Sequence, residues 1–152
     1  MDDTALPFYV NGTKFYAGPI TLAYCMDGYN EIQETVTSYN SRVDRIKRIK
    51  NEAEKYIPIH FSVDIAINSK GILSVGLGET ESVIVWYNST DDVYLTSLGD
   101  EQAIGSKLYY FGDWSDMSNK YAISWEAALL VIKVWIKTGD IGNCIKWTSI
   151  IY

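Results

Sequence analysis

The sequence predicts an α+β fold in which a mostly antiparallel β-sheet carries a single layer of two helices. The main observation is a meander pattern in residues 71–100, where three β-branched and aromatic runs are separated by two loops of hairpin length. A second observation is that the two helical patterns, one before the meander and one after it, never alternate with its strands. Because no helix crosses between those strands, an antiparallel sheet fits better than a parallel one.

The N-terminal part predicts short strands. Asn11 and Gly12 lie between two aromatic runs in residues 8–16, which indicates a β-hairpin. Residues 20–26 form an apolar run of strand length, and we expect a further strand there.

The first helix is predicted from about Asn30 to Tyr56, because apolar residues recur there every three or four positions. Asn30 is a suitable cap, and Pro58 stops the helix. Weak helix formers gather near residues 39–41, which is compatible with a break at that point.

The rest of the chain returns to strands and adds one further helix. Residues 59–67 alternate between apolar and polar types, which predicts a strand with one buried face leading into the meander. A short strand at 107–111 precedes a polar loop, GDWSDMSNKYA, and a closing strand is expected over 144–151. Between them Ser124 caps a helix from Trp125 to about Thr138, and Gly139 ends it.

Length and composition indicate one ordinary globular domain over residues 1–152. Apolar residues make up 47% of the chain and charged residues 21%. No apolar run reaches 18 residues and the N-terminus, MDDTALPF, lacks a positively charged leader, so we expect a cytoplasmic protein without a membrane segment. Cys25 and Cys144 lie in apolar sequence. We expect free thiols, with a disulfide as the alternative.

Charge is unevenly distributed along the chain. The net charge of −6 argues against direct nucleic-acid binding. Residues 42–55 hold six lysines and arginines against three carboxylates, whereas residues 76–120 hold eight carboxylates against two lysines. An acidic rim that recurs at successive loops would attract a basic partner and speed its association.

Catalytic and metal-binding patterns are weak. His60 is the sole histidine, which excludes sites built on two histidines. Adjacent loop carboxylates such as Asp91 and Asp92 stay ionised in water and make a poor acid–base pair. The sequence therefore predicts no catalytic residue, metal or cofactor. A small enzyme that uses His60 with Cys25 or Cys144 stays open as an alternative.

Binding to another protein is better supported by the aromatic residues. Tryptophan and tyrosine dominate interface hot spots, and this chain contains five and twelve of them. Trp114 lies between Asp113 and Asp116 in the predicted polar loop, so it either anchors that loop against the sheet or contacts a partner. A small-ligand module that uses the aromatic sheet face is a further alternative.

Four segments carry short motifs with characteristic glycine, serine and tryptophan positions: LSVGLGETESVIVWY, VYLTSLGDE, LYYFGDWSDM and AISWEAALLVIKVWIKTGDIGNCIKW. Together they resemble the first-numbered immunity-protein family of bacterial polymorphic toxin systems. The residues that carry the resemblance are Gly76, Gly78, Ser82, Ser97, Gly99, Asp100, Ala127, Ala128, Thr138, Gly139 and Trp147. The resemblance covers residues 59–147. It departs from the family pattern at residues 140–143, which lack an expected proline, and the N-terminal hairpin has no counterpart.

The resemblance implies a non-enzymatic cytoplasmic inhibitor that protects its producer and its kin from a cognate secreted toxin in interbacterial competition. Such proteins bind one toxin tightly and block its active-site cleft or substrate surface. Toxins paired with these families often act on nucleic acid and so carry basic surfaces, which the acidic loops would complement. The expected contacts are Glu79, Glu81, Asp91, Asp92, Asp100, Glu101, Asp113, Trp114 and Asp116.

Overall fold

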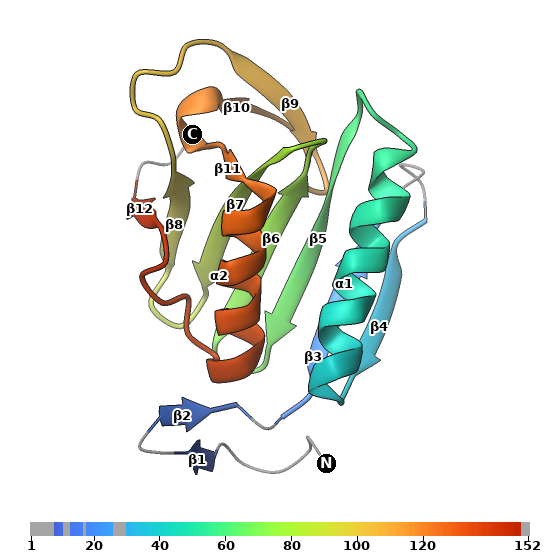
Figure 1. The fold of residues 1–152 in the computed structure, drawn as a ribbon, viewed down its shortest axis with the longest axis vertical. Helices are drawn as coiled ribbons and strands as arrows, with labels where there is room; N and C mark the ends of the chain where they lie inside the picture. The colour runs from blue at the N-terminus through green and yellow to red at the C-terminus, as the bar shows by residue number, and fades with distance from the viewer. Residues whose placement is uncertain (1–7, 11–12, 17, 26–29, 150–152) are drawn as a thin grey trace.

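The fold is built on one large, mostly antiparallel sheet. We describe it from a computed structural model, which describes residues 8–10, 13–16, 18–25 and 30–149. Within those residues the sheet has ten strands. Seven of them lie side by side in the order β4 (Ile32–Val36), β3 (Ile20–Tyr24), β5 (His60–Ile67), β6 (Gly71–Leu77), β7 (Glu81–Asn88), β8 (Val93–Leu98) and β12 (Lys146–Thr148). The predicted α+β class and the β6–β7–β8 meander are confirmed (Figure 1).

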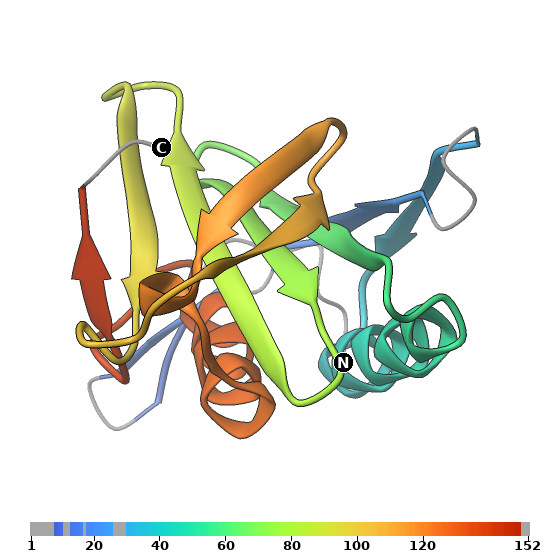
Figure 2. The same ribbon diagram turned by 90° about the horizontal axis from the view of Figure 1, so that it is seen from above.

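Two helices, α1 (Tyr39–Glu54) and α2 (Trp125–Thr138), cover one face of this sheet (Figure 2). The sequence predicts both ends of α2 correctly. The Ser124 hydroxyl accepts a hydrogen bond from the Ala127 N–H at 3.1 Å, and Gly139 takes the left-handed conformation, with φ 78°, that ends the helix. Among the described helices, none has the length and hydrophobicity needed to span a bilayer.

The main core fills the space between the helices and the sheet. Inward residues of the central strands, such as Ile65 and Leu73, are fully buried there. Trp135 of α2 is also fully buried, and its indole N–H donates to the Ile65 carbonyl at 3.0 Å. This bond fixes α2 to the central strand, because a buried indole N–H is costly to leave unpaired.

Two cations of α1 are buried on the same side of the sheet. The Arg42 guanidinium donates to the carbonyls of Ile136 and Thr37, both at 3.1 Å, and to that of Gly18. Lys50 forms an ion pair with Glu54 at 2.7 Å and donates to the Glu79 carbonyl at 3.1 Å. Each cation therefore ties α1 to a neighbouring segment.

A hairpin of β9 (Ser106–Tyr110) and β10 (Trp114–Ser118) crosses the opposite face of the sheet (Figure 2). It joins the sheet through a short parallel pairing, in which His60 and Phe61 of β5 lie beside Tyr109 and Tyr110. The short helix η1 (Asn119–Tyr121) and strand β11 (Ile123–Ser124), which pairs with β7, lead the chain from this hairpin into α2.

Gly76 makes room for the hairpin on the sheet. A Cβ at this position would lie 2.5 Å from the Tyr109 ring and 3.1 Å from the Phe111 ring. Tyr109 consequently packs flat on β6, and with Met117 and Tyr121 it covers Val83 in a second, smaller core. The absence of one side chain thus determines where the hairpin lies.

Two of the predicted elements differ in the structure. The segment predicted as the start of the first helix forms strand β4, and α1 begins only at Tyr39, close to the weak helix formers. The predicted polar loop after β9 contains strand β10, so Trp114 begins a strand. The N-terminal hairpin is confirmed as β1 (Phe8–Val10) paired with β2 (Thr13–Phe15), although its predicted turn residues, Asn11 and Gly12, lie outside the described residues.

Candidate functional site

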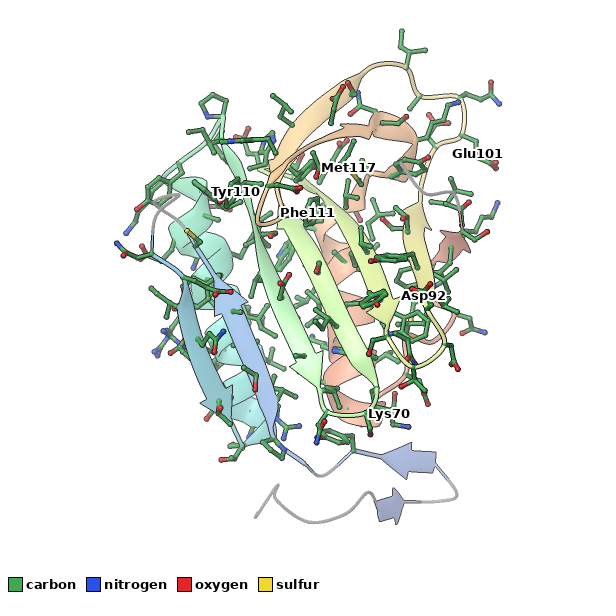
Figure 3. The ribbon with its side chains drawn as sticks, turned by 180° about the vertical axis from the view of Figure 1, so that it is seen from behind. Lys70, Asp92, Glu101, Tyr110, Phe111 and Met117 are labelled. Atoms are coloured by element: carbon green, nitrogen blue, oxygen red, sulfur yellow. The ribbon has the colours of Figure 1, made fainter. Side chains whose placement is uncertain are left out.

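The face that carries the hairpin is only partly covered. Figure 3 looks onto this face, where Tyr110 and Phe111 mark the end of the hairpin above the central strands. A cavity of about 640 Å³ lies between the hairpin and the open part of the sheet. We call it the hairpin groove. Its lining residues are Asp64, Ile72, Ser74, Val85, Tyr87, Tyr94, Thr96, Phe111, Asp113, Trp114, Ser115 and Asp116.

Two rows of cross-strand neighbours form the floor of the groove. In the first row Asp64, Ser74, Val85 and Thr96 lie side by side across β5, β6, β7 and β8. The second row comprises Ile72, Tyr87 and Tyr94. Successive side chains of a strand point to opposite faces, so both rows follow from the register of the meander. Two of the three residues in the second row are aromatic, and the Tyr87 and Tyr94 rings stack with their centroids 4.3 Å apart.

Asp64 places a partly buried carboxylate on this floor. Its Oδ1 accepts a hydrogen bond from the Ser74 hydroxyl at 2.7 Å. Burial raises the pKa of the Asp64 carboxyl above its ordinary value; the nearby charge of Glu31 raises it further, and the Ser74 hydrogen bond opposes the shift. Asp64 and Glu31 also line a second cavity of about 260 Å³ on the other side of the hairpin end.

The hairpin supplies the wall of the groove. Trp114 is 56% exposed, and its ring meets the Tyr110 ring edge to face at 5.2 Å. Asp113 accepts a hydrogen bond from the Ser115 hydroxyl at 3.3 Å, and Asp116 is exposed. Among the described residues that line the groove there are three carboxylates and no lysine or arginine. The groove is therefore both acidic and aromatic.

The nine residues predicted as contacts fall into three groups. Asp113, Trp114 and Asp116 line the groove itself. Asp91 and Asp92 lie in the β7–β8 turn, directly beyond the Tyr87–Tyr94 pair, and Figure 3 shows Asp92 at that end of the sheet. The remaining four, Glu79, Glu81, Asp100 and Glu101, lie at the opposite end of β7 and β8.

Two of the four residues at the far end also have structural contacts. Glu81 forms an ion pair with Lys107 of the hairpin at 3.2 Å. The Asp100 carboxylate accepts the Gln102 N–H at 2.9 Å, which shapes the β8–β9 loop. Seven residue steps of about 3.3 Å along β7 place this end roughly 23 Å from the Asp91–Asp92 turn.

The basic segment in residues 42–55 uses much of its charge within the molecule. Arg42 and Lys50 are buried, and Arg45 pairs with Glu34 at 2.8 Å. Lys55 pairs with Glu52 of the same helix at 3.0 Å. Three of the six cations in this segment, Arg45, Lys50 and Lys55, are therefore in ion pairs. The groove carboxylates, in contrast, have no basic neighbour among the described residues that line the groove.

The structure does not assemble the cysteine–histidine pair of the enzyme alternative. Cys25 and Cys144 are not joined by a disulfide. Cys25 lines the smaller cavity, but His60 does not, and the Nδ1 of His60 lies 3.2 Å from the Leu108 carbonyl. Cys144 immediately precedes β12, which is four strands away from β5. Within the described part of the chain, no three histidine, cysteine or carboxylate side chains come together as a metal site.

Comparison with known families identifies the kind of protein that carries this groove. The family model described as immunity protein Imm1 matches residues 33–149. The chain belongs to the Imm1 family. The match confirms the resemblance found in the sequence, and it extends that resemblance upstream from residue 59 into β4. A search of curated proteins found no match to this Imm1 chain.

The matched region contains every residue of the Imm1 groove. Sequence reasoning named Asp113, Trp114 and Asp116 of its hairpin wall, but it did not single out Asp64, Ile72, Ser74 and Thr96 of its floor. A local signal for Asp64 was present, because the alternation of residues 59–67 puts it on the polar side of its strand. The sequence around Asp64 gives no sign that the hairpin folds back over this side of the strand.

Proposed function

We propose that this Imm1 protein binds a cognate secreted bacterial toxin domain and neutralises it by covering its active or substrate-binding surface. The hairpin groove and its acidic rim form the docking face. The inhibitor acts in the cytoplasm by binding alone and changes no covalent bond. Membership of the Imm1 family supports the toxin partner.

The composition of the hairpin groove supports its choice as the docking face. It combines exposed aromatic rings, Tyr94 and Trp114, with three carboxylates and no basic residue among its described lining. Aromatic residues supply most binding energy at protein interfaces, while charges steer the encounter. The opposite face of the sheet is occupied by α1 and α2. A basic toxin surface is the partner that this composition fits.

The dimensions of the face allow the whole predicted rim to take part. A protein interface of ordinary size covers about 800 Å² on each partner, a patch roughly 28 Å across. The two acidic ends of β7 and β8 are separated by roughly 23 Å. One toxin domain seated in the groove would therefore reach Asp91 and Asp92 at one end and Glu79 and Glu101 at the other.

The groove volume favours one competing function, the binding of a small ligand. About 640 Å³ lies within the range of small-molecule pockets, roughly 300–1,000 Å³. Such pockets enclose most of their ligand, however, and here Ile72, Tyr94, Trp114 and Asp116 are exposed. A broad and open groove fits the surface of a protein better.

The test uses the toxin domain encoded beside the gene for this chain, produced together with the chain in a susceptible bacterium. We expect the wild-type chain to restore growth and to bind the purified toxin domain. Combining Trp114→Ala with Asp116→Lys should abolish protection. The matched control combines Lys47→Glu with Arg48→Glu on the exposed side of α1, and it should protect fully.

If the α1 control failed to protect the bacterium while the groove variant still protected it, the assignment of the docking face would be overturned. Failure of the wild-type chain to bind the toxin would overturn the proposed function. Tight binding of a metabolite in the groove without any toxin binding would support the competing function.

A further inference from the structure

Asp64 is the groove carboxylate whose surroundings least favour a negative charge. It lies between β3 and β6 in the middle of the sheet, where burial opposes its charge, and Glu31 adds a second negative charge nearby. The Ser74 hydroxyl bonds to one of its oxygens, Oδ1. A charge in such a place is costly unless a partner of opposite sign compensates it. Among the described residues, no lysine or arginine lines either of the two cavities that Asp64 faces.

The surroundings of Asp64 are suited to a flat cation. Phe111 lines both of the cavities that Asp64 faces. The stacked rings of Tyr87 and Tyr94 lie on the same floor, two residues along the strands from the Asp64 row, on β7 and β8. Trp114 lines the same cavity from the hairpin. Aromatic faces attract cations, and they do so most strongly where water is displaced.

We propose that the hairpin groove receives an arginine side chain of the toxin, whose guanidinium pairs with Asp64 and stacks on the aromatic side chains around it. This inference rests on the proposed function, since it names the toxin group that the docking face recognises. Asp64 would then be a specificity-determining residue at the centre of the interface.

Arginine fits this site better than lysine for two reasons. Its planar guanidinium can bond to a carboxylate in two places and stack on an aromatic ring at the same time, which an ammonium cannot do. It is also more weakly hydrated, so it loses less on entering a partly buried site. An apolar toxin side chain would leave the Asp64 charge uncompensated, and an acidic one would be repelled.

The first experiment needs no toxin. Three blocked tripeptide amides with glycine on both sides of arginine, lysine or glutamine are titrated into the isotopically labelled protein, and amide and indole NMR shifts are recorded. We expect the arginine peptide to shift the signals of Ser74, Tyr94 and the Trp114 indole at millimolar concentration. Lysine should bind more weakly, and glutamine should have no effect.

The same titration with Asp64→Asn separates a specific site from general attraction. The matched control is Asp44→Asn, which removes one negative charge from an exposed position of α1, outside the groove. Asp64→Asn should abolish the arginine response, and Asp44→Asn should leave it unchanged. Equal responses to arginine and glutamine, equal responses to arginine and lysine, or an unchanged response in Asp64→Asn would each overturn the inference.

The second experiment measures toxin affinity. Breaking a buried charge pair costs about 2 kcal/mol or more, which corresponds to about thirtyfold in Kd. We expect at least that loss for Asp64→Asn and less than about threefold for Asp44→Asn, an exposed charge outside the groove. Changing one toxin arginine to glutamine should weaken binding to the wild-type chain by a similar factor. The same toxin change should cause no further loss of affinity when it is combined with Asp64→Asn.

The outcomes distinguish this inference from the proposed function. If Asp64→Asn binds the toxin normally while the Trp114→Ala and Asp116→Lys combination does not, the arginine inference fails and the docking face stands. If no groove variant affects the toxin, both fail.

Discussion

The two faces of the sheet are built for different tasks. On the helix face, Ile65 and Trp135 are fully buried, and even the buried Arg42 and Lys50 are bonded to neighbouring segments. On the hairpin face, part of the sheet lies open beside the hairpin, Asp64 is partly buried, and Trp114 is exposed. The helix face contains the main core, whereas the hairpin face leaves polar and aromatic side chains open for the proposed docking of the toxin.

The same strands supply both faces. In β5, Val63 and Ile65 point to the helices, whereas Ser62 and Asp64 point to the hairpin side. The position of a residue in the alternation therefore decides whether a substitution affects folding or binding. The predictions below test this division, from the largest expected effect to the smallest.

Removing the largest buried side chain should nearly unfold the protein. Trp135→Ala leaves a cavity between α2 and the sheet and removes the hydrogen bond to the Ile65 carbonyl, so we expect a loss of about 3–5 kcal/mol in unfolding free energy. Urea denaturation followed by circular dichroism measures it. The matched change on the other face is Tyr94→Ala, which should cost about 1 kcal/mol because the ring is 41% exposed. Equal losses of unfolding free energy in Trp135→Ala and Tyr94→Ala would refute the division between the two faces.

Removing the buried guanidinium should have the next largest effect. Arg42→Met keeps much of the side-chain volume but leaves the carbonyls of Gly18, Thr37 and Ile136 without this donor. We expect a loss of about 2–3 kcal/mol, because these are buried bonds to a charged group. Arg48→Met, at an exposed position of the same helix, is the control and should change stability by less than about 0.5 kcal/mol. A cost below 1 kcal/mol for Arg42→Met would show that the buried cation is dispensable.

A methyl group on Gly76 should displace the hairpin. Its Cβ would clash with the Tyr109 ring, so Gly76→Ala should cost about 1–3 kcal/mol. Burial, with a smaller contribution from the charge of Glu81, raises the pKa of Tyr109 to about 12. We therefore expect this pKa to fall toward 10 in the variant, as measured by ultraviolet titration.

Gly112→Ala is the control for this prediction. It strains a backbone with φ 92° at the hairpin end, where a Cβ would meet no atom within 4 Å. It should therefore lower stability by about 1 kcal/mol and leave the Tyr109 pKa near 12. A pKa that stays high in Gly76→Ala would mean that the hairpin does not depend on this glycine.

Neutralising Asp64 should stabilise the protein. Burial and the Glu31 charge raise the pKa of Asp64 above its ordinary value of 3.8, so the folded state binds its proton more tightly than the unfolded chain. Its contribution to stability is therefore present below pH 3.8 and is lost as the pH rises through the higher folded-state pKa. Asp64→Asn should raise the melting temperature at pH 7, and the gain should disappear near pH 3.8. A gain of the same size in Asp116→Asn would indicate general charge repulsion instead.

Reversing a rim charge should affect binding and leave the fold intact. Asp91→Lys lies in an exposed turn and should change unfolding free energy by less than about 0.5 kcal/mol. Under the proposed function it slows association with the toxin and reduces the dependence of that rate on salt. Stopped-flow measurements at two ionic strengths provide the test, with Asp44→Lys on α1 as the control. Unchanged association would remove Asp91 from the docking face.

Local signals explain how much of the fold the sequence predicts. Ser124 and Gly139 define α2 because capping depends on a few adjacent residues. Strand β4 was missed because the step of four from Ile32 to Val36 fits one face of a strand as well as one face of a helix. Its pairing with β3, a long-range contact, decides between the two.

The candidate site was predicted less completely for a related reason. Its hairpin wall was found through composition, since Trp114 lies between two aspartates. Its floor needs the hairpin to fold back onto β6, which depends on the fit of Tyr109 against Gly76. These residues are far apart in sequence, and neither shows its partner by any local pattern.

The contacts of Arg42 also bear on the order in which the molecule assembles. Its guanidinium joins α1 to the carbonyl of Ile136, 94 positions later in the chain. During synthesis the meander can close on neighbouring turns, but α1 gains this anchor only after α2 has left the ribosome. A chain stopped before residue 136 would therefore keep at most the Arg42 bonds to the Gly18 and Thr37 carbonyls, and it would lack the bond that joins the first helix to the second.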